Sequence, residues 1–210
     1  MTIKTIIFDF GGVITNSPIE GFKKLEEKHG YDKGIITNIN MNNPDNNAWA
    51  RSERGEIEIN TFLEEFEKEA LLIGQKIDAK EILNQLYGSL RENMINKIKS
   101  LSYSKKYKLV CLTNVLKGVE IFTPKDRIRA VNKIMSHFDL IYESYKLGMR
   151  KPEPRIYKHL LKIMNIKPEE TVFLDDLGMN LKSARKLGIN TIKVIDPNNA
   201  IIELDKILER

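Results

Sequence analysis

Five short apolar segments, unevenly spaced along the chain, constrain its fold more than any other feature. They lie at residues 3–9, 107–112, 139–142, 171–174 and 191–194, and each runs into a turn or helix signal. Near-continuous apolar runs of this length are typical of β-strands that are buried on both faces. From residue 107 onward they alternate with helical patterns, at 153–164 and 180–187. Such alternation indicates parallel strands joined by right-handed crossovers.

A long stretch between the first and second segments contains no convincing strand. At about a hundred residues it far exceeds an ordinary crossover, so we expect it to form a unit of its own. Its clearest helix begins near Asn60, a plausible N-cap. The apolar residues of that helix fall on one face: Phe62, Leu63, Phe66 and Ala70.

These patterns predict an α/β fold with a Rossmann-like three-layer core built on a parallel sheet, plus an α-helical cap inserted after the first strand. Residues 1–15 and 105–210 are expected to form the core. Residues 16–104 are expected to form the mostly helical cap and the helix that returns to the core.

The composition excludes several classes of protein. Of the 210 residues, 41% are hydrophobic and 30% are charged, which argues against a disordered chain. No apolar stretch reaches the roughly 18 residues that a membrane span requires, and the N-terminus lacks a secretion signal. We therefore expect a cytoplasmic protein without a membrane partner. The single cysteine, Cys111, lies in an apolar run and is interpreted as a buried strand residue.

The basic residues are concentrated in the second half of the chain. Residues 105–210 hold 21 of the 34 basic residues and 13 of the 29 acidic ones. This charge can attract anionic substrates, although solvated helix faces produce the same excess. No nucleic-acid motif and no interleaved aromatics accompany it, so no nucleic-acid partner is expected. The sequence does not decide between a monomer and a homodimer, or whether segment 117–129 is a loop at the mouth of a ligand site or a partner surface.

The first apolar segment ends in one aspartate, Asp9, followed by a phenylalanine and two glycines. An aspartate at the carboxyl end of a buried parallel strand projects into the crevice where open α/β sheets bind ligands. Gly11 and Gly12 allow a phosphate or a metal ion to approach the backbone closely. We interpret Asp9 as a candidate nucleophile, because a covalent phospho-aspartate divides one difficult hydrolysis into two easier displacements.

Two further segments supply polar groups at predicted strand ends. Thr113 and Asn114 follow the second strand, where a hydroxyl and an amide suit phosphoryl oxygens; strand capping and turn formation are the alternative. Lys151 precedes Pro152, which keeps it extended, and a lysine in a rigid loop can neutralise transition-state charge. Most lysines are solvated, and the neighbouring Arg150 competes for the same role.

The fourth apolar segment ends in two adjacent acids, Asp175 and Asp176. Like charges that emerge together from an apolar run are costly unless a cation joins them. With Asp9 they form an oxygen-rich site for a hard cation that keeps several waters, which is the preference of Mg²⁺. The alternative is that one of these acids caps the helix that follows.

In their order along the chain, the four segments resemble the four motifs of the haloacid dehalogenase superfamily of phosphohydrolases, from residue 3 to about 194. YKLGMRKPEP at residues 145–154 and VFLDD at 172–176 are similar to the N-terminal phosphatase domain of soluble epoxide hydrolase and to bacterial glucose-1-phosphate-type sugar phosphatases. Segment 49–57, which contains ERGE, resembles the cap of the same subgroup. The resemblance implies a Mg²⁺-dependent phosphatase of a small phosphorylated metabolite, with a cap that closes over the site and selects the substrate.

The resemblance also implies a role for each candidate residue. Asp9 would be the nucleophile and a metal ligand, and the backbone carbonyl of Gly11 a second ligand. Asp176 would bind Mg²⁺ directly, and Asp175 would bind it through water or orient the other ligands. The candidate catalytic residues are thus Asp9, Thr113 and Lys151, and the candidate phosphate-binding residues are Gly12, Thr113, Asn114 and Lys151.

Position 11 departs from most of the superfamily, which carries there an aspartate that protonates the leaving group and activates water. General acid/base help is worth about 10² to 10⁴-fold, so Gly11 predicts slow turnover or a restriction to anomeric or acyl phosphates. Two other functions stay open: a metal-independent dehalogenase-type hydrolase and a non-catalytic module that binds a phosphorylated ligand. Against the dehalogenase stand the adjacent acids at 175 and 176 and the lack of an arginine before Arg51 to hold a departing halide.

Overall fold

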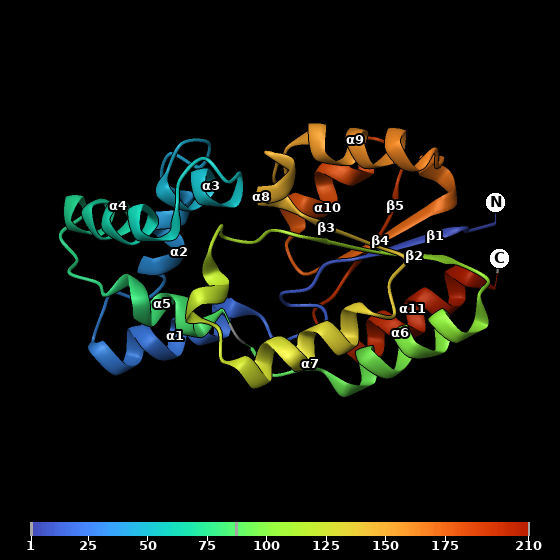
Figure 1. Ribbon diagram of the computed structural model, residues 1–210, viewed down its shortest axis with the longest axis horizontal. Coiled ribbons are helices and arrows are strands. Elements are labelled where there is room, and N and C mark those ends of the chain that lie inside the picture. The colour runs from blue at the N-terminus through green and yellow to red at the C-terminus, as the bar shows by residue number, and fades with distance from the viewer. Residues whose placement is uncertain (1, 87, 210) are drawn as a thin grey trace.

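The computed structural model describes residues 2–86 and 88–209. Its centre is a parallel sheet with the strand order β3-β2-β1-β4-β5 (Figure 1). The strands are β1 (Thr5–Phe8), β2 (Lys108–Thr113), β3 (Leu140–Glu143), β4 (Thr171–Asp175) and β5 (Asn190–Lys193). Each overlaps one of the five apolar segments, and all neighbours pair in parallel, so the predicted α/β fold is confirmed.

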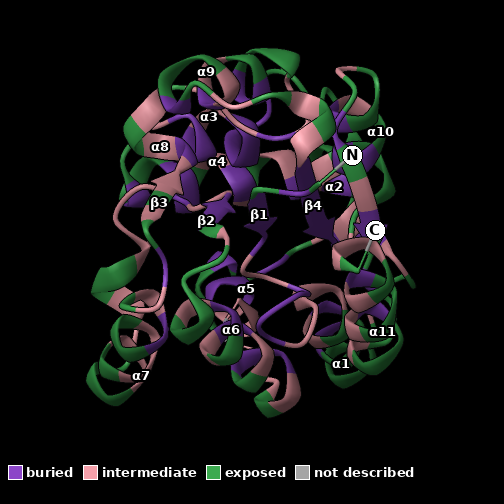
Figure 2. Cartoon of the chain, turned by 90° about the vertical axis from the view of Figure 1, so that its right-hand side faces the viewer, coloured by how far each residue is buried: buried purple, intermediate pink, exposed green. Residues whose placement is uncertain are grey.

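Helices cover both faces of the sheet (Figure 1). One face is covered by α6 (Glu92–Ser104), α7 (Lys125–Met135) and α11 (Pro197–Leu208), and the other by α9 (Pro154–Met164) and α10 (Gly178–Arg185). Two short helices, α8 (Ser144–Leu147) and the 3-10 helix η2 (Pro168–Glu170), lie in the connections. Figure 2 shows the central strands β1, β2 and β4 buried between these layers. Within residues 2–86 and 88–209, none of the helices combines the length and the apolar character that a membrane crossing demands.

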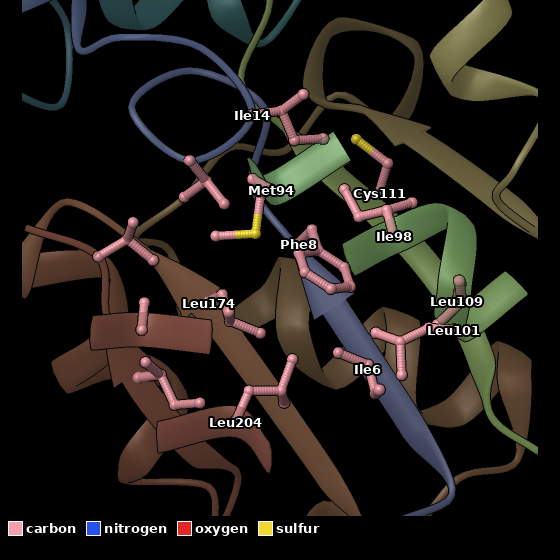
Figure 3. Close-up of a cluster of buried hydrophobic side chains, with 14 of the residues drawn as sticks. Ile6, Phe8, Ile14, Met94, Ile98, Leu101, Leu109, Cys111, Leu174 and Leu204 are labelled. Atoms are coloured by element: carbon pink, nitrogen blue, oxygen red, sulfur yellow. The ribbon is translucent and has the colours of Figure 1, made fainter. Parts of the chain in front are cut away.

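Burial on both faces of the sheet explains the near-continuous apolar runs. Along β1, Ile6 and Phe8 pack on one face and Ile7 on the other, because successive side chains of a strand alternate. Figure 3 shows the first face, where Phe8 lies in one cluster with Cys111 and with Met94 of α6. Cys111 is buried, as predicted, and burial raises the pKa of its thiol, which favours the protonated, unreactive form.

The register of the sheet brings several strand ends to one place. Phe8 pairs with Cys111 of β2 and with Leu174 of β4, so the ends of these three strands emerge at one edge of the sheet. The N–H of Asp9 extends this pairing by donating to the Leu174 carbonyl at 2.9 Å. The strand order reverses between β1 and β4, which is the topological switch point where open α/β sheets bind ligands.

A helical unit lies beside this carboxyl edge of the sheet (Figure 1). Its helices are α1 (Pro18–His29), α2 (Ile35–Met41), α3 (Ala48–Glu53), α4 (Ile59–Leu72) and α5 (Ala79–Gln85). They enclose an apolar cluster of their own around Trp49. The ring centroid of Trp49 lies 6.0 Å from that of Phe22, 5.6 Å from that of Phe62 and 6.1 Å from that of Phe66. Aromatic contacts of this kind hold three of the helices together.

Helix α4 has the predicted apolar face but begins earlier than predicted. The expected residues are buried in the cluster of the helical unit: Phe62, Leu63, Phe66 and Ala70. The N-cap is Glu58, and the prediction of Asn60 is wrong, since Asn60 lies inside the first turn. Ile59 is 4% exposed and belongs to the same cluster, so its burial within the helix outweighs the capping preference of Asn60.

The chain leaves the sheet for the helical unit and returns from it at adjacent points. Thr15 and Leu90 form an isolated antiparallel bridge, and the N–H of Asn16 donates to the carbonyl of Ser89 at 2.9 Å. Helix α6 follows this return and packs in the cluster of the sheet. The predicted limits of the inserted unit, residues 16–104, stay a prediction.

The segment after β2, whose role the sequence leaves undecided, packs against the helical unit. Leu116 is 3% exposed within the cluster of that unit. The 3-10 helix η1 (Val119–Phe122) rests on the same cluster through its first and last residues. A Cβ on Gly118 would lie 3.2 Å from the side chain of Ile59, so the backbone runs close to α4 at this point. Segment 116–122 therefore ties the end of a core strand to the helical unit.

Candidate active site

Three carboxylates from two neighbouring strands converge at the carboxyl edge of the sheet. Asp9 follows β1, Asp175 ends β4 and Asp176 comes next, and each offers an oxygen within 4.8 Å of the others. Asp9 is 7% exposed, and Asp175 is fully buried. The pairing of Phe8 with Leu174 produces the arrangement, because it places the following residues of both strands at the same level.

One ammonium group lies among these carboxylates. The Nζ of Lys151 is 2.7 Å from Oδ1 of Asp9 and 2.9 Å from Oδ2 of Asp175. Burial opposes the charge on Lys151, but Asp175 and Asp9 outweigh it and raise the pKa of the lysine. Arg150, the competing candidate, turns toward the helical unit, where its Nε lies 2.5 Å from Oε2 of Glu53. The lysine, and not the arginine, therefore stands at the carboxylates.

The excess of acid dominates the electrostatics of the site. Burial raises the pKa of Asp9 well above its ordinary value; Lys151 opposes this shift, and Asp175 adds to it. Burial also raises the pKa of Asp176, again with Asp175 adding to the shift. Three carboxylates facing one ammonium group form a site that a divalent cation would balance, and oxygen ligands are those that Mg²⁺ prefers. The residues present therefore fit a magnesium ion.

The loop after β1 approaches the carboxylates closely at Gly12 but not at Gly11. Gly12 has φ +73°, and a Cβ on it would lie 2.1 Å from Oδ2 of Asp176, so a side chain cannot be added without moving the acid. Arg91 donates from Nη1 to the carbonyl of Gly12 at 2.7 Å and fixes the loop from the other side. A Cβ on Gly11 would lie 3.8 Å from the ring of Pro18, which is an ordinary contact. The fold thus leaves room for a Cβ at position 11.

Two residues that the sequence does not single out hold the acids in place. Asn180 of α10 donates from Nδ2 to both oxygens of Asp175, at 3.0 Å each. Ser17 donates from Oγ to Oδ2 of Asp176 at 2.8 Å. Asp175 also accepts the N–H of Leu177 at 2.8 Å, so it supports the turn into α10 as well. Asn180 lies about one helical turn beyond the acids, a spacing that could reveal it; nothing in the sequence marks Ser17.

Asn114 binds protein groups with both ends of its amide. Nδ2 donates to the Lys151 carbonyl and to Oε2 of Glu53, at 2.9 Å each, and Oδ1 accepts the N–H of Lys151 at 2.9 Å. The side chain predicted to hold phosphoryl oxygens thus also holds the loop of Lys151. Thr113 ends β2 and is 6% exposed, and its hydroxyl donates to the carbonyl of Asn114 at 3.4 Å. Phosphate binding by Gly12, Thr113 and Asn114 stays a prediction.

The helical unit touches the core beside these residues through segment 53–56. Arg54 is 8% exposed, and its Nη1 donates to Oε1 of Glu153, at the N-cap of α9, at 3.3 Å. Gly55 has φ +72°, and a Cβ on it would lie 2.6 Å from the carbonyl oxygen of Tyr145. The backbone of the helical unit is therefore in close contact with α8, the short helix that precedes the loop of the candidate lysine.

Comparison with known proteins points to one family. Residues 3–188 match the haloacid dehalogenase-like hydrolases. The chain is 29% identical over 216 residues to bifunctional epoxide hydrolase 2 of Sus scrofa, which covers 99% of the chain and 39% of that protein. It is 27% identical over 200 residues to D-ribitol-5-phosphate phosphatase of Bacteroides thetaiotaomicron, which covers 91% of each. The chain spans 39% or less of the length of the mammalian relatives that it matches.

A solved structure agrees with this match. A haloacid dehalogenase family enzyme from Bacteroides thetaiotaomicron, in complex with magnesium and inorganic phosphate, is similar with a TM-score of 0.60 and 25% identity. The likeness covers 91% of this chain and 93% of that one. The resemblance inferred from the motifs, including that to epoxide hydrolase and sugar phosphatases, is confirmed.

Proposed function

The chain belongs to the haloacid dehalogenase-like hydrolase family, and we propose that it is a Mg²⁺-dependent phosphatase of a small phosphorylated metabolite. The observation that carries the proposal is the convergence of Asp9, Asp175 and Asp176 around the ammonium group of Lys151. The similarity to a phosphatase of D-ribitol 5-phosphate over most of both chains supports a small phosphate ester as the substrate.

The magnesium ion would be held by Asp9, Asp176 and the backbone carbonyl of Gly11. Asp175, whose oxygens accept from protein groups, would bind it through water or orient the other ligands. When bound, the ion supplies positive charge that offsets the charge on the phosphoryl oxygens. Lys151 contributes a second positive charge, held at 2.7 Å from Asp9 and 2.9 Å from Asp175. This charge balance is needed because three carboxylates alone would repel a phosphate group.

In the proposed reaction Asp9 is the nucleophile. One of its carboxylate oxygens bonds to phosphorus while the bond from phosphorus to the leaving-group oxygen breaks. Water then attacks the acyl phosphate, which releases inorganic phosphate and restores the carboxylate. Lys151 favours the ionised Asp9 that the first step requires, against the burial that raises the pKa of this acid.

Gly11 limits which substrates can react quickly. Without a carboxyl group at this position, the leaving oxygen has to take its proton from water or depart as an anion. We therefore propose that good leaving groups, such as those of anomeric or acyl phosphates, are turned over faster than alkyl phosphates.

The proposal is tested by measuring phosphate release from aryl and sugar phosphates with and without Mg²⁺. We expect Mg²⁺-dependent hydrolysis that falls by at least about 10³-fold in Asp9→Asn, because an amide does not replace the nucleophile. Asp78→Asn, at the N-cap of α5, serves as the control and should keep its activity. Hydrolysis that persists unchanged in Asp9→Asn would contradict the proposal.

The glycine at position 11 also favours a second function, a module that binds a phosphorylated ligand without turning it over. Tight Mg²⁺-dependent binding of beryllium fluoride, together with no hydrolysis across a broad panel of phosphate esters, would identify such a module. Halide release from chloroacids in the absence of metal would identify a dehalogenase-type hydrolase instead.

A further inference from the structure

We propose that Glu53 is a positioning residue that couples the helical unit to Lys151 through Asn114. Glu53 ends α3 in the helical unit, whereas Asn114 follows β2 and Lys151 lies in the loop before α9. Three segments that are far apart in the sequence are thus linked by side-chain contacts. The catalytic consequence of this link rests on the proposed phosphatase function.

Glu53 is a buried carboxylate that accepts three hydrogen bonds. It is 7% exposed, and its Oε1 accepts from Nε1 of Trp49 at 2.9 Å. Its Oε2 accepts from Nδ2 of Asn114 at 2.9 Å and from Nε of Arg150 at 2.5 Å. Because Trp49 lies in the aromatic centre of the helical unit, the position of Glu53 is set by that unit. The core residues Asn114 and Arg150 thus bind a carboxylate that is anchored in the helical unit.

The amide of Asn114 has one orientation that satisfies its neighbours. The N–H of Lys151 requires an acceptor, which must be Oδ1, and Nδ2 then faces the Lys151 carbonyl and Glu53. Both hydrogens of Nδ2 are used in this way, one on each partner. Glu53 therefore adds an anchor in the helical unit to the amide that binds both the N–H and the carbonyl of Lys151.

The clamp on the backbone of Lys151 determines where its ammonium group lies. The side chain is 1% exposed. Its Nζ contacts Asp9 and Asp175 and lies 5.5 Å from the ring centroid of Phe173. A buried chain of this kind transmits a backbone shift to its end. Misplacement of a catalytic group by about 1 Å can reduce the rate about 10²-fold. The site is thus complete only when α3 is seated on the core.

The decisive variant is Glu53→Gln, which keeps the size of the side chain. A glutamine offers one acceptor oxygen. If that oxygen faces Asn114 and Arg150, the bond from Trp49 is lost, and if it faces Trp49, the amide nitrogen meets two donors; in both orientations the link from Trp49 to Asn114 is broken. We expect kcat to fall by about 10- to 100-fold with KM changed less than about twofold. An unchanged kcat would overturn the proposal.

A matched control separates positioning from loss of stability. Glu26 is a carboxylate of the same helical unit, 3% exposed, that accepts the N–H of Gly34 at 2.8 Å and that of Ile36 at 3.1 Å. Glu26→Gln should destabilise the helical unit and leave kcat unchanged. A fall in kcat equal to that of Glu53→Gln would mean that Glu53 acts only through stability, which overturns the proposal.

A double-mutant cycle tests the route through Asn114. In an Asn114→Ala background, Glu53→Gln should lower kcat less than about twofold further, since the link is already broken. If Glu53→Gln lowered kcat by the same factor in the Asn114→Ala background as in the wild type, Glu53 would not act through Asn114.

A measurement without turnover distinguishes failure of this inference from failure of the phosphatase function. We expect the backbone amide resonance of Lys151 to shift in Glu53→Gln and to stay in place in Glu26→Gln. If the wild-type protein hydrolyses no phosphate ester, the phosphatase function fails, while this pattern of shifts still supports the coupling. A Lys151 resonance that is unmoved in Glu53→Gln overturns the coupling whatever the activity.

Discussion

At the scale of residues, the two adjacent glycines after β1 differ in whether a Cβ fits: it fits at Gly11 and overlaps Asp176 at Gly12. We expect Gly12→Ala to abolish Mg²⁺ binding, because its Cβ would overlap Asp176, and to lower the free energy of unfolding by about 1–2 kcal/mol through its positive φ. Gly11→Ala is the matched control and should change that free energy by less than about 0.5 kcal/mol. Urea unfolding and calorimetric Mg²⁺ titration check both variants. If both variants lost Mg²⁺ binding and stability equally, the close approach to Asp176 would not be specific to Gly12.

Because a Cβ fits at Gly11, we expect a gain of function from an acid placed there. Gly11→Asp should raise turnover of alkyl phosphates by about 10² to 10⁴-fold, since a carboxyl group there can protonate the leaving oxygen and activate water. Aryl phosphates, whose leaving groups depart without a proton, should gain much less. Gly11→Asn has the same shape without the acid and should show no gain. Steady-state kinetics on both substrate classes measure the effect. A folded Gly11→Asp variant that turns over alkyl phosphates no faster than the wild type would show that the missing acid at position 11 does not limit the rate.

At the scale of elements, segment 116–122 ties the end of β2 to the helical unit. Leu116→Ala should lower the free energy of unfolding by about 2–5 kcal/mol, because Leu116 is 3% exposed in the cluster of that unit. Ile121→Ala, in the same segment but at a side chain 73% exposed, should cost less than about 0.5 kcal/mol. Chemical unfolding measures both. Similar values for the two variants would show that the segment does not anchor the helical unit.

The elements that the sequence predicted are those whose signal is local. Each strand is a single apolar run, and the parallel register then brings Asp9 and Asp175 together. The start of α4 was predicted wrongly. It depends on the burial of Ile59 in a cluster whose other members lie far away in the sequence. Glu53 of α3 accepts from Asn114, which follows β2 and lies 61 residues further along the chain, and no local pattern in the sequence reveals that contact.

At the scale of the whole molecule, the unbalanced acids couple metal binding to stability. Mg²⁺ at about 100 times its Kd should raise the free energy of unfolding by about 2.7 kcal/mol, because it binds the assembled carboxylates and not the unfolded chain. EDTA should remove the effect, and Asp176→Asn should reduce it. Calorimetric unfolding at constant ionic strength measures the change. A rise of equal size with K⁺ would attribute it to general screening.

The chain leaves and re-enters the core at neighbouring points, where Asn16 and Ser89 are joined by a 2.9 Å hydrogen bond. An insertion with adjoining ends behaves as an exchangeable module, because a replacement of different length leaves β1 and α6 where they are. A transplanted module has two requirements to meet: an acceptor for the amide of Asn114 and an apolar recess for Leu116. Within those two conditions, evolution or an engineer can replace the helices and keep the three carboxylates at the edge of the sheet.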